Sequence, residues 1–233
     1  MIRALVLAAV EVEARALGGR LGLARVSANG WSHYRSGALE ILCVGLGASR
    51  LAERASDLEP PSLVISAGVC GALAPHLRRG DLVVPETVVT PEGARIQTHA
   101  WPGLSRAGTL LTIRNVVDTP AAKARLWMET SAQAVDMESS IILAWAEARG
   151  LPAVVVRAVA DTAREAVPAD LAALVDPGGR VQAGRAVRAA LARPRALADA
   201  ISLGRSTDAA LRTVAVALGR VAVRAAAGGE ASL

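Results

Sequence analysis

Six short runs of apolar and β-branched residues recur along this chain of 233 residues, and they limit its fold more than any other feature of the sequence. Several are apolar at nearly every position, which is the pattern of strands buried on both faces of a sheet. The runs are residues 4–10, 39–45, 62–68, 81–89, 108–113 and 153–160. Helical patterns lie between them. This alternation predicts an α/β fold, a single domain with a mostly parallel or mixed central sheet flanked by helices.

Three helical segments are predicted between these strands. The first covers residues 48–59 and stops before a pair of prolines. The second begins at Pro120, which suits the first helical position, and Thr119 provides its N-cap. The third covers residues 139–150. One face of this third helix is predicted to carry Ile141, Ile142, Trp145 and Ala148.

Charge divides the chain into residues 1–180 and residues 181–233. The second part holds eight arginines against three acidic residues, which accounts for the whole net charge of +5. Its apolar residues at helical spacing are Leu211, Val214, Leu218 and Val221, with Arg212, Arg220 and Arg224 on another face. We therefore predict a basic amphipathic helical segment packed on the first domain. A helix that covers the sheet or contacts another subunit is favoured over one that lies on a membrane surface.

Composition argues against nucleic acid as a partner, because aromatic residues make up only 2% of the chain and single-strand platforms need aromatic side chains between basic ones. Cys43 and Cys70 lie in apolar runs without a CxxC partner and are predicted to be buried free thiols. His33, His76 and His99 lack the spacing of metal ligands and are predicted to lie on the surface or in loops. No metal site is expected.

The N-terminal apolar run is interpreted as a first strand rather than a signal peptide. It is short, and Glu11 and Glu13 follow it where a cleavage site should be. No uncharged apolar run approaches the roughly 20 residues that a membrane span needs. The sequence therefore predicts a cytoplasmic protein, with peripheral membrane contact through the basic C-terminal helix as an alternative.

Acidic residues and glycines follow several predicted strands, at the carboxyl ends where an open parallel sheet binds its ligands. The acidic residues are Glu11, Glu13, Asp136, Glu138 and Asp161, and the glycine-rich segment is residues 68–73. They could converge on one cleft, where carboxylates act as general acids, general bases or ligands of sugar hydroxyls. Each residue taken alone could equally cap a helix, begin a turn or remain solvated.

Three stretches together carry a family resemblance: SAGVCGALAPHLRRGDLVVP at residues 66–85, AVDMESS at 134–140 and LPAVVVRAVAD at 151–161. In this order they resemble the purine nucleoside phosphorylase and nucleosidase superfamily. The nearest likeness is to the methylthioadenosine/S-adenosylhomocysteine nucleosidases and the short hopanoid-associated phosphorylases. The resemblance covers roughly residues 1–165, and it implies a nucleoside phosphorylase-like fold.

The resemblance also implies roles for individual side chains. Glu13 corresponds to the glutamate that activates water, and Asp161 to the aspartate that protonates the purine at N7. Glu138 corresponds to the glutamate that holds the ribose 2′ and 3′ hydroxyls, with Met137 beneath the sugar. Arg157 corresponds to an arginine that neighbours the water-activating glutamate. Burial would keep Asp161 protonated, whereas Arg157 would keep Glu13 ionised.

Four further residues complete the expected substrate-binding set. Val116 and Val117 stand where the nucleosidases place a Phe and an Ile against the base, so the base pocket is predicted to be looser and aliphatic. Gly68 and Gly71 come from the glycine-rich segment.

The sequence also departs from the superfamily pattern. Superfamily phosphorylases carry an Arg at the position of Ser66 and a hydroxyl residue at that of Val69, both serving phosphate. Their absence favours water as the nucleophile, although Arg50 or an arginine of a neighbouring subunit could still supply a phosphate site. The segment at residues 90–120 is short relative to the nucleosidases, which would open the 5′ end of the pocket to a bulky apolar substituent.

These observations predict an enzyme that cleaves the N-glycosidic bond of an adenine nucleoside and releases adenine. Hydrolysis is slightly favoured over phosphorolysis, with no cofactor and with phosphate only as a candidate co-substrate. Adenosylhopane is the substrate hypothesis. The alternatives are a methylthioadenosine/S-adenosylhomocysteine nucleosidase and a nucleoside-binding protein without catalysis. The resemblance implies a homodimer or higher homo-oligomer.

Overall fold

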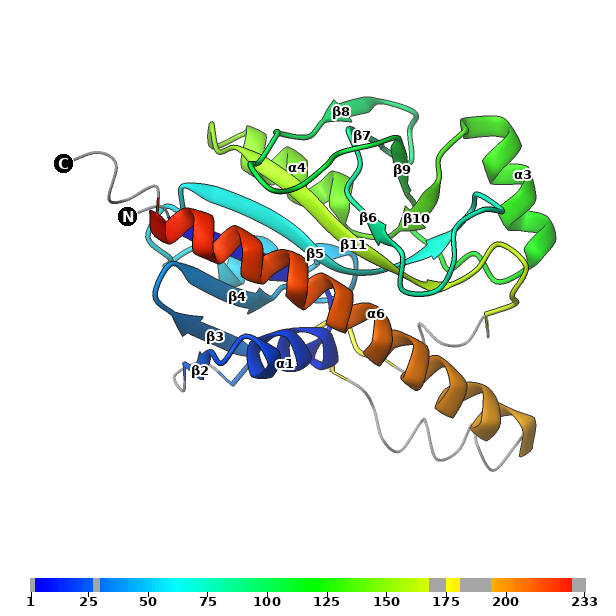
Figure 1. Ribbon diagram of the computed structural model, residues 1–233, viewed down its shortest axis with the longest axis horizontal. Coiled ribbons are helices and arrows are strands. Elements are labelled where there is room, and N and C mark those ends of the chain that lie inside the picture. Colours follow the sequence, from blue (N-terminus) through cyan, green and yellow to red (C-terminus); the bar gives the residue numbers. More distant parts are fainter. Residues whose placement is uncertain (1–2, 27–29, 168–174, 181–193, 228–233) are drawn as a thin grey trace.

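The computed structural model describes residues 3–26, 30–167, 175–180 and 194–227. These residues form the predicted α/β fold, an eleven-stranded mixed sheet with helices packed on it (Figure 1). The strands are β1 (Ala4–Ala8), β2 (Ala24–Arg25), β3 (His33–Ser36), β4 (Leu39–Cys43), β5 (Leu63–Ala72), β6 (Leu82–Val83), β7 (Thr87–Val89), β8 (Arg95–Gln97), β9 (Thr109–Thr112), β10 (Ala134–Asp136) and β11 (Ala153–Asp161). The helices are α1 (Glu11–Arg20), α2 (Leu51–Arg54), α3 (Pro120–Thr130), α4 (Ser139–Glu147) and α6 (Pro194–Ala227), with a 3₁₀ turn η1 (Leu46–Ala48).

Strand β5 lies at the centre of the sheet. It runs parallel to β1 and to β11, and its last residues pair with β10 in the antiparallel sense. Strand β4 extends the parallel set on the other side of β1. The chain segments that follow β1, β5 and β11 therefore leave the sheet at the same edge, where such folds bind ligands.

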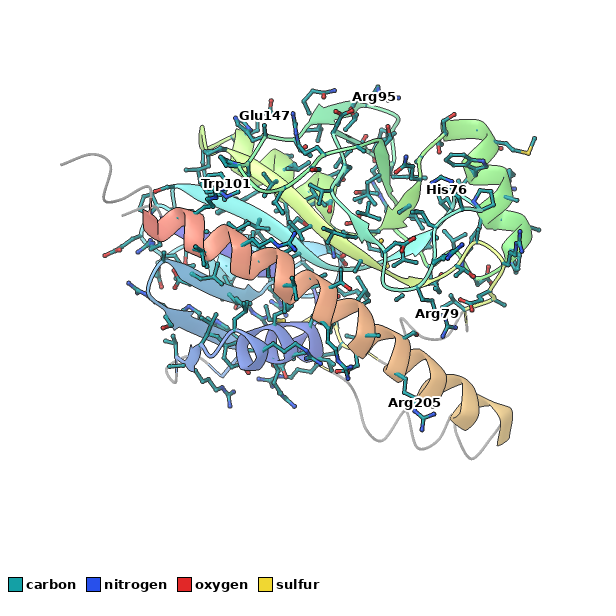
Figure 2. All side chains as sticks on the ribbon, viewed as in Figure 1. His76, Arg79, Arg95, Trp101, Glu147 and Arg205 are labelled. Carbon is teal, nitrogen blue, oxygen red and sulfur yellow. The ribbon has the colours of Figure 1, made fainter. Side chains whose placement is uncertain are left out.

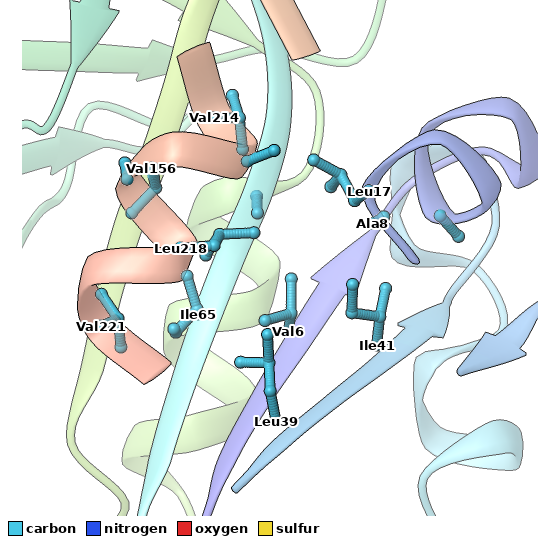
Figure 3. Close-up of a cluster of buried hydrophobic side chains, with 14 of the residues drawn as sticks. Val6, Ala8, Leu17, Leu39, Ile41, Ile65, Val156, Val214, Leu218 and Val221 are labelled. Carbon is cyan, nitrogen blue, oxygen red and sulfur yellow. The ribbon is translucent and has the colours of Figure 1, made fainter. Parts of the chain in front are cut away.

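Both faces of the sheet are buried, as the nearly continuous apolar runs predict. On β1, Val6 and Ala8 face the layer formed by α1 and α6, whereas Leu5 and Leu7 face the layer that contains α4. Figure 3 shows the first of these clusters, to which β1 contributes Val6, α1 contributes Leu17 and α6 contributes Leu218. The core thus has two layers of apolar side chains, one on each side of a shared sheet.

The C-terminal helix α6 covers the sheet beside α1 (Figure 1). All four predicted apolar positions of this helix, Leu211, Val214, Leu218 and Val221, are buried against β5 and β11. The basic side chains Arg212, Arg220 and Arg224 are exposed on its outer face, and Arg205 also projects away from the molecule (Figure 2). The start of the predicted segment, residues 181–193, lies outside the described residues. Among the helices that the structure describes, none is long and apolar enough to cross a membrane.

Every predicted apolar run contains a strand, but two details differ from expectation. The run at residues 81–89 is divided into β6 and β7, because Pro85 between them has no N–H group to contribute to a ladder. The short strands β2, β3, β8 and β10 were not predicted, since two to four residues give too short a pattern to recognise.

Two helix predictions need correction. The helix predicted over residues 48–59 is only the single turn α2, because Ser56 turns its hydroxyl to the Glu53 carbonyl (2.9 Å) and local bonds of this kind compete with a helix. On α4, the predicted face is correct for Ile142 and the half-buried Trp145 and wrong for the other two positions. Ile142, Leu143 and Ala146 are buried, whereas Ile141 and Ala148 are exposed.

The histidine prediction holds for two residues and fails for the third. His76 and His99 are exposed, and His76 lies beside α3 (Figure 2). His33 is instead buried in β3, where its Nε2 lies 2.8 Å from Oε1 of Glu40 on β4. The two residues are diagonal neighbours across the β3–β4 pair, so a buried polar pair satisfies both side chains. Cys43 and Cys70 are buried free thiols, as predicted.

Candidate active site

A cavity of about 280 Å³ opens at the edge of the sheet where β1, β5 and β11 end. Its lining is mostly aliphatic. The predicted site residues that line it are Glu13, Gly71, Val116, Val117, Met137, Glu138, Arg157 and Asp161. Residues from five separate parts of the chain therefore meet around one cavity.

Glu13 lies at the start of α1, directly after β1. Its Oε2 accepts hydrogen bonds from the backbone N–H groups of Ala9 and Val10 (3.2 and 3.3 Å), so the side chain folds back over the N-terminus of its own helix. Its Oε1 accepts a hydrogen bond from the backbone N–H of Val69 on β5 (2.9 Å). These bonds fix the carboxylate between the first and the central strand.

Burial raises the pKa of Glu13, while the charge of Arg157 and the three backbone N–H groups act in the opposite direction. The expectation that Arg157 would keep this group ionised is therefore not supported in direction, because burial outweighs the charge of Arg157. A carboxylate with a raised pKa is a stronger base than one in water, which suits a group that removes a proton from a nucleophile near neutral pH.

Arg157 is the buried centre of an ionic network. Its Nη2 lies 2.8 Å from Oδ2 of Asp136 and 3.7 Å from Oε2 of Glu138, and it donates to Ser66 Oγ at 2.9 Å. Side chains of both Arg157 and Asp136 are 1% exposed. The pKa of Arg157 is raised, because burial opposes its charge but the surrounding carboxylates outweigh that effect.

Glu138 joins this network at the N-terminal end of α4. Its Oε1 accepts a hydrogen bond from the backbone N–H of Gly47 (3.0 Å). The pKa of Glu138 is raised to about 7, chiefly by burial and further by the carboxylates of Asp136 and Glu13, while the charge of Arg157 and the Gly47 hydrogen bond act in the opposite direction. Such a group gains most from ligands that donate hydrogen bonds to it, as ribose hydroxyls do.

Asp136 supports the site mainly through structure. It accepts hydrogen bonds from the Ser139 N–H (3.2 Å) and from the Thr112 hydroxyl (2.8 Å), in addition to its ion pair with Arg157. The helix-capping interpretation of this residue therefore fits its contacts. Glu11 does not line the cavity and instead forms an ion pair with Arg180 (3.2 Å).

Asp161 reaches the cavity from the end of β11. The pairing of β11 with β5 shifts register between Val159 and Asp161, and an irregularity of this kind redirects a side chain at a strand end. Asp161 forms a short ion pair with Lys123 of α3. Burial raises the pKa of Asp161, and the neighbouring Lys123 opposes this effect. The upward shift of this pKa agrees with the expectation that burial favours the protonated form of Asp161.

The two glycines of the predicted site make room for the acidic residues. A Cβ atom at Gly68, where φ is +153°, would lie 2.6 Å from Oε1 of Glu13 and 2.7 Å from Nη1 of Arg157. A Cβ atom at Gly71 would lie 3.1 Å from Oδ2 of Asp161. Gly68 does not line the cavity, so its expected contact with the substrate is replaced by a contact with the residues that form the site.

Comparison with known proteins places the chain in a family. The family model described as Phosphorylase superfamily matches residues 102–193. A futalosine hydrolase of Streptomyces coelicolor is 31% identical over 183 residues, covering 61% of this chain and 77% of that protein. The chain belongs to the phosphorylase superfamily. It is therefore a nucleosidase- or phosphorylase-type enzyme, of the class that cleaves N-glycosidic bonds.

Solved structures share the fold of this phosphorylase-superfamily chain. A 5′-methylthioadenosine nucleosidase of Arabidopsis thaliana matches with a TM-score of 0.68 at 19% identity, covering 94% of this chain and 96% of that one. A 5′-methylthioadenosine/S-adenosylhomocysteine nucleosidase of Helicobacter pylori matches at 0.69 and 17%, covering 95% and 97%. Futalosine hydrolase of the same organism matches at 0.68 and 16%, covering 96% and 97%. Because the sequence identities are this low, the similarity to these solved structures shows a shared fold only.

Lys123 is a charged cavity residue that sequence reasoning missed. It is the only lysine of the chain, in a composition where arginine supplies the other basic side chains. The presence of a single lysine among arginines was the signal that could have pointed to it. A planar guanidinium group cannot replace an ammonium group at a site whose acceptors fit a compact, tetrahedral donor.

The raised pKa of Glu138 predicts a pH effect on stability. A carboxyl group whose pKa rises on folding contributes full stability below its unfolded pKa, about 4.5, and loses it as the pH rises through about 7. Glu138→Gln is therefore expected to flatten the decline in unfolding free energy between pH 4.5 and 7. Urea unfolding of wild type and variant at several pH values measures this. Glu53→Gln, at an exposed position, is the control and should keep the wild-type slope. Parallel curves for wild type and Glu138→Gln would contradict the assignment.

Proposed function

We propose that this protein is a nucleosidase that hydrolyses the N-glycosidic bond of an adenine nucleoside and releases adenine. The observation that carries the proposal is the convergence of Glu13, Glu138 and Asp161 on one cavity from three separate elements. The three carboxyl groups are positioned by hydrogen bonds and ion pairs that leave room for a ligand between them.

The chemistry of the bond explains why three carboxyl groups are useful. Breaking the bond between C1′ and N9 leaves electrons on the purine and positive charge on the ribose. Protonated Asp161 can give its proton to N7 of the leaving base. Glu13 can take a proton from the water whose oxygen forms the new bond to C1′. The products are then free adenine and a ribose with a hydroxyl group at C1′.

The charge of the cavity supports water rather than phosphate as the nucleophile. Among the described lining residues, four acidic side chains (Glu13, Asp136, Glu138 and Asp161) accompany two basic ones (Lys123 and Arg157). Both basic groups already bind carboxylates. A surplus of negative charge favours a cationic sugar and disfavours a phosphate anion.

Two positions bear on a phosphate site: Ser66, where superfamily phosphorylases carry an Arg, and Arg50, the alternative phosphate ligand of this chain. Ser66 is buried and bonds both Arg157 (2.9 Å) and Ser139 (3.0 Å). Arg50 lies on the surface, where it pairs with Glu53 at 3.0 Å, and it does not line the cavity. These contacts support the sequence-based preference for hydrolysis.

The adenosylhopane hypothesis draws support from the lining of the cavity. Apart from its ionic groups, the wall is built largely of aliphatic side chains, including Val12, Leu46, Ile113 and Val175. Such a wall accommodates an apolar 5′ substituent better than a charged one. The basic outer face of α6 is the proposed contact with a membrane that holds the lipid substrate. A methylthioadenosine/S-adenosylhomocysteine nucleosidase remains the alternative within the same reaction class.

Hydrolysis of futalosine is a second candidate function. The observation in its favour is the 31% identity with a futalosine hydrolase over most of that protein. Hydrolysis of futalosine is the same type of reaction as the first proposal, but the nucleoside that the cavity must bind is different.

Release of the free base from several nucleosides, with and without phosphate, tests the proposal. Purified protein is incubated with adenosine, 5′-methylthioadenosine, a series of 5′-alkyl adenosines and futalosine, and products are separated by chromatography. We expect release that does not depend on phosphate, with oxygen from ¹⁸O-labelled water at C1′ of the sugar. Release that requires phosphate and yields a sugar 1-phosphate would overturn hydrolysis. Faster release from methylthioadenosine than from any 5′-alkyl adenosine would overturn the adenosylhopane hypothesis.

A further inference from the structure

Lys123 is a fully buried cation next to the expected acid of the reaction. Its side chain is 1% exposed, and its Nζ contacts Oδ2 of Asp161. The same nitrogen donates to the backbone carbonyl groups of Thr162 (2.9 Å) and Glu165 (2.8 Å). An ammonium group has three N–H donors, so these three acceptors satisfy it completely. Lys123 is thus a charged group with no donor left for a substrate.

The elements around Lys123 are arranged so that its position is fixed. It lies in the first turn of α3, whose N-cap Thr119 accepts a hydrogen bond from the backbone N–H of Ala122 (3.2 Å). On the opposite side, Glu165 accepts from the Thr162 N–H (2.8 Å) and pairs with Arg79 (2.9 Å). The loop after β11 is therefore held to α3 through a single amine.

The contact also distinguishes the two oxygens of Asp161. Oδ2 is bound by Lys123, and among the described residues no hydrogen bond reaches Oδ1. Gly71 lies against the same carboxyl group, where a Cβ atom would approach Oδ2 at 3.1 Å. Lys123 binds Oδ2, and β5 confines the carboxyl group. Oδ1 is therefore the oxygen of Asp161 that is available to a ligand in the cavity.

We propose that Lys123 is a positioning residue, which holds Asp161 by Oδ2 so that Oδ1 presents the proton to the leaving base, and whose charge stabilises the carboxylate that remains. This inference rests on the proposed function, since it assigns Asp161 as the acid. The proton moves from Oδ1 to N7 as the bond between C1′ and N9 breaks. Asp161 becomes a carboxylate, and its negative charge lies beside the Lys123 ammonium.

The electrostatic part of the proposal follows from opposing effects on one group. Burial raises the pKa of Asp161, which keeps its proton available, whereas the adjacent cation lowers it, which makes the group a stronger acid. The other charged or titratable groups that act on Asp161 are Glu165, Arg79 and the thiol of Cys70. Lys123 is the one that contacts the carboxyl group directly.

Three variants separate charge, geometry and stability. Lys123→Met removes the cation and the hydrogen bonds. Lys123→Arg keeps the charge but presents a planar group to acceptors that match a tetrahedral one. Thr119→Ala weakens the start of α3, at a cost of about 1 kcal/mol, and leaves the amine in place. It is the matched control for a loss of helix stability.

The first readout is the pH dependence of kcat for adenine release. Lys123→Met is expected to lower kcat by about 10- to 100-fold through loss of orientation. It should also move the alkaline limb of the profile to higher pH, because the pKa of Asp161 rises when its cation is removed. Lys123→Arg should lower kcat but leave the alkaline limb near its wild-type pH. Thr119→Ala should change neither. An unmoved alkaline limb in Lys123→Met would overturn the proposal and leave Lys123 a purely structural residue.

The second readout does not depend on activity. The carboxyl carbon of Asp161 is titrated by ¹³C NMR in the wild type and in Lys123→Met and Lys123→Arg, with Asp161→Asn identifying the signal. The pKa of Asp161 should rise in the Met variant and stay close to the wild-type value in the Arg variant. If the wild type releases no base from any nucleoside but these shifts appear, the proposed reaction fails while the control of Asp161 by Lys123 stands. If the Asp161 signal titrates identically in all three proteins, the proposal fails whatever the activity.

Discussion

Glu13→Gln is expected to lower kcat for adenine release by about 10²- to 10⁴-fold, the range that a positioned general base contributes. A glutamine cannot accept the proton of the attacking water. Its amide nitrogen would also face one of the backbone N–H groups that now bind the carboxylate, those of Ala9, Val10 and Val69. The measurement is kcat at saturating nucleoside, together with urea unfolding to establish that the variant is folded.

Glu53→Gln provides the control for this prediction. Glu53 is 56% exposed and pairs only with the surface residue Arg50 among the ion pairs described, so its kcat should equal that of the wild type. A folded Glu13→Gln protein that retains wild-type kcat would contradict the role of Glu13 as the base. The residual rate of the Glu13→Gln protein also measures the background activity of any contaminating nucleosidase in the preparation.

Arg157→Met is expected to lower the free energy of unfolding by about 3–5 kcal/mol at pH 7. Arg157 is buried against Asp136 and Glu138, and its removal leaves their buried charges without a partner. Protonation can relieve such charges. The loss should therefore become smaller at pH 5 than at pH 7, and urea unfolding at both pH values measures this difference.

Arg212→Met is the matched control for Arg157→Met. Arg212 is 70% exposed and pairs with Asp208 at 2.7 Å one helical turn away, a kind of surface ion pair that contributes about 0–1 kcal/mol. Arg157→Lys should fall between the two, because it keeps the charge but loses the guanidinium geometry. Equal losses in Arg157→Met and Arg212→Met would show that the buried network does not stabilise the fold.

The architecture of the sheet was predictable from the sequence because it depends on local patterns. The runs that became β1, β5 and β11 are apolar on both faces, and such runs need layers of helix on each side. The position of Glu13 and Asp161 followed as well, since the carboxyl ends of parallel strands share one edge. Identification of their roles required the family resemblance in addition.

Features that depend on contacts between distant residues were not predictable in the same way. The burial of His33 requires its diagonal partner Glu40, which strand register alone provides. The ion pair between Lys123 and Asp161 joins residues 38 positions apart, and no local pattern connects α3 to the end of β11. The role of Gly68, which makes room for Glu13 and Arg157, becomes visible only when the three residues are placed together.

The most direct test of the central claim is a crystal structure of the Glu13→Gln variant with 5′-methylthioadenosine bound. According to the central claim, Glu13, Glu138 and Asp161 surround a single ribosidic bond. The account predicts N7 of the base within about 3 Å of Oδ1 of Asp161 and the ribose 2′ and 3′ hydroxyls within the same distance of Glu138. It also predicts a water between residue 13 and C1′. A nucleoside bound with its base away from Asp161, or with its ribose hydroxyls away from Glu138, would contradict the account.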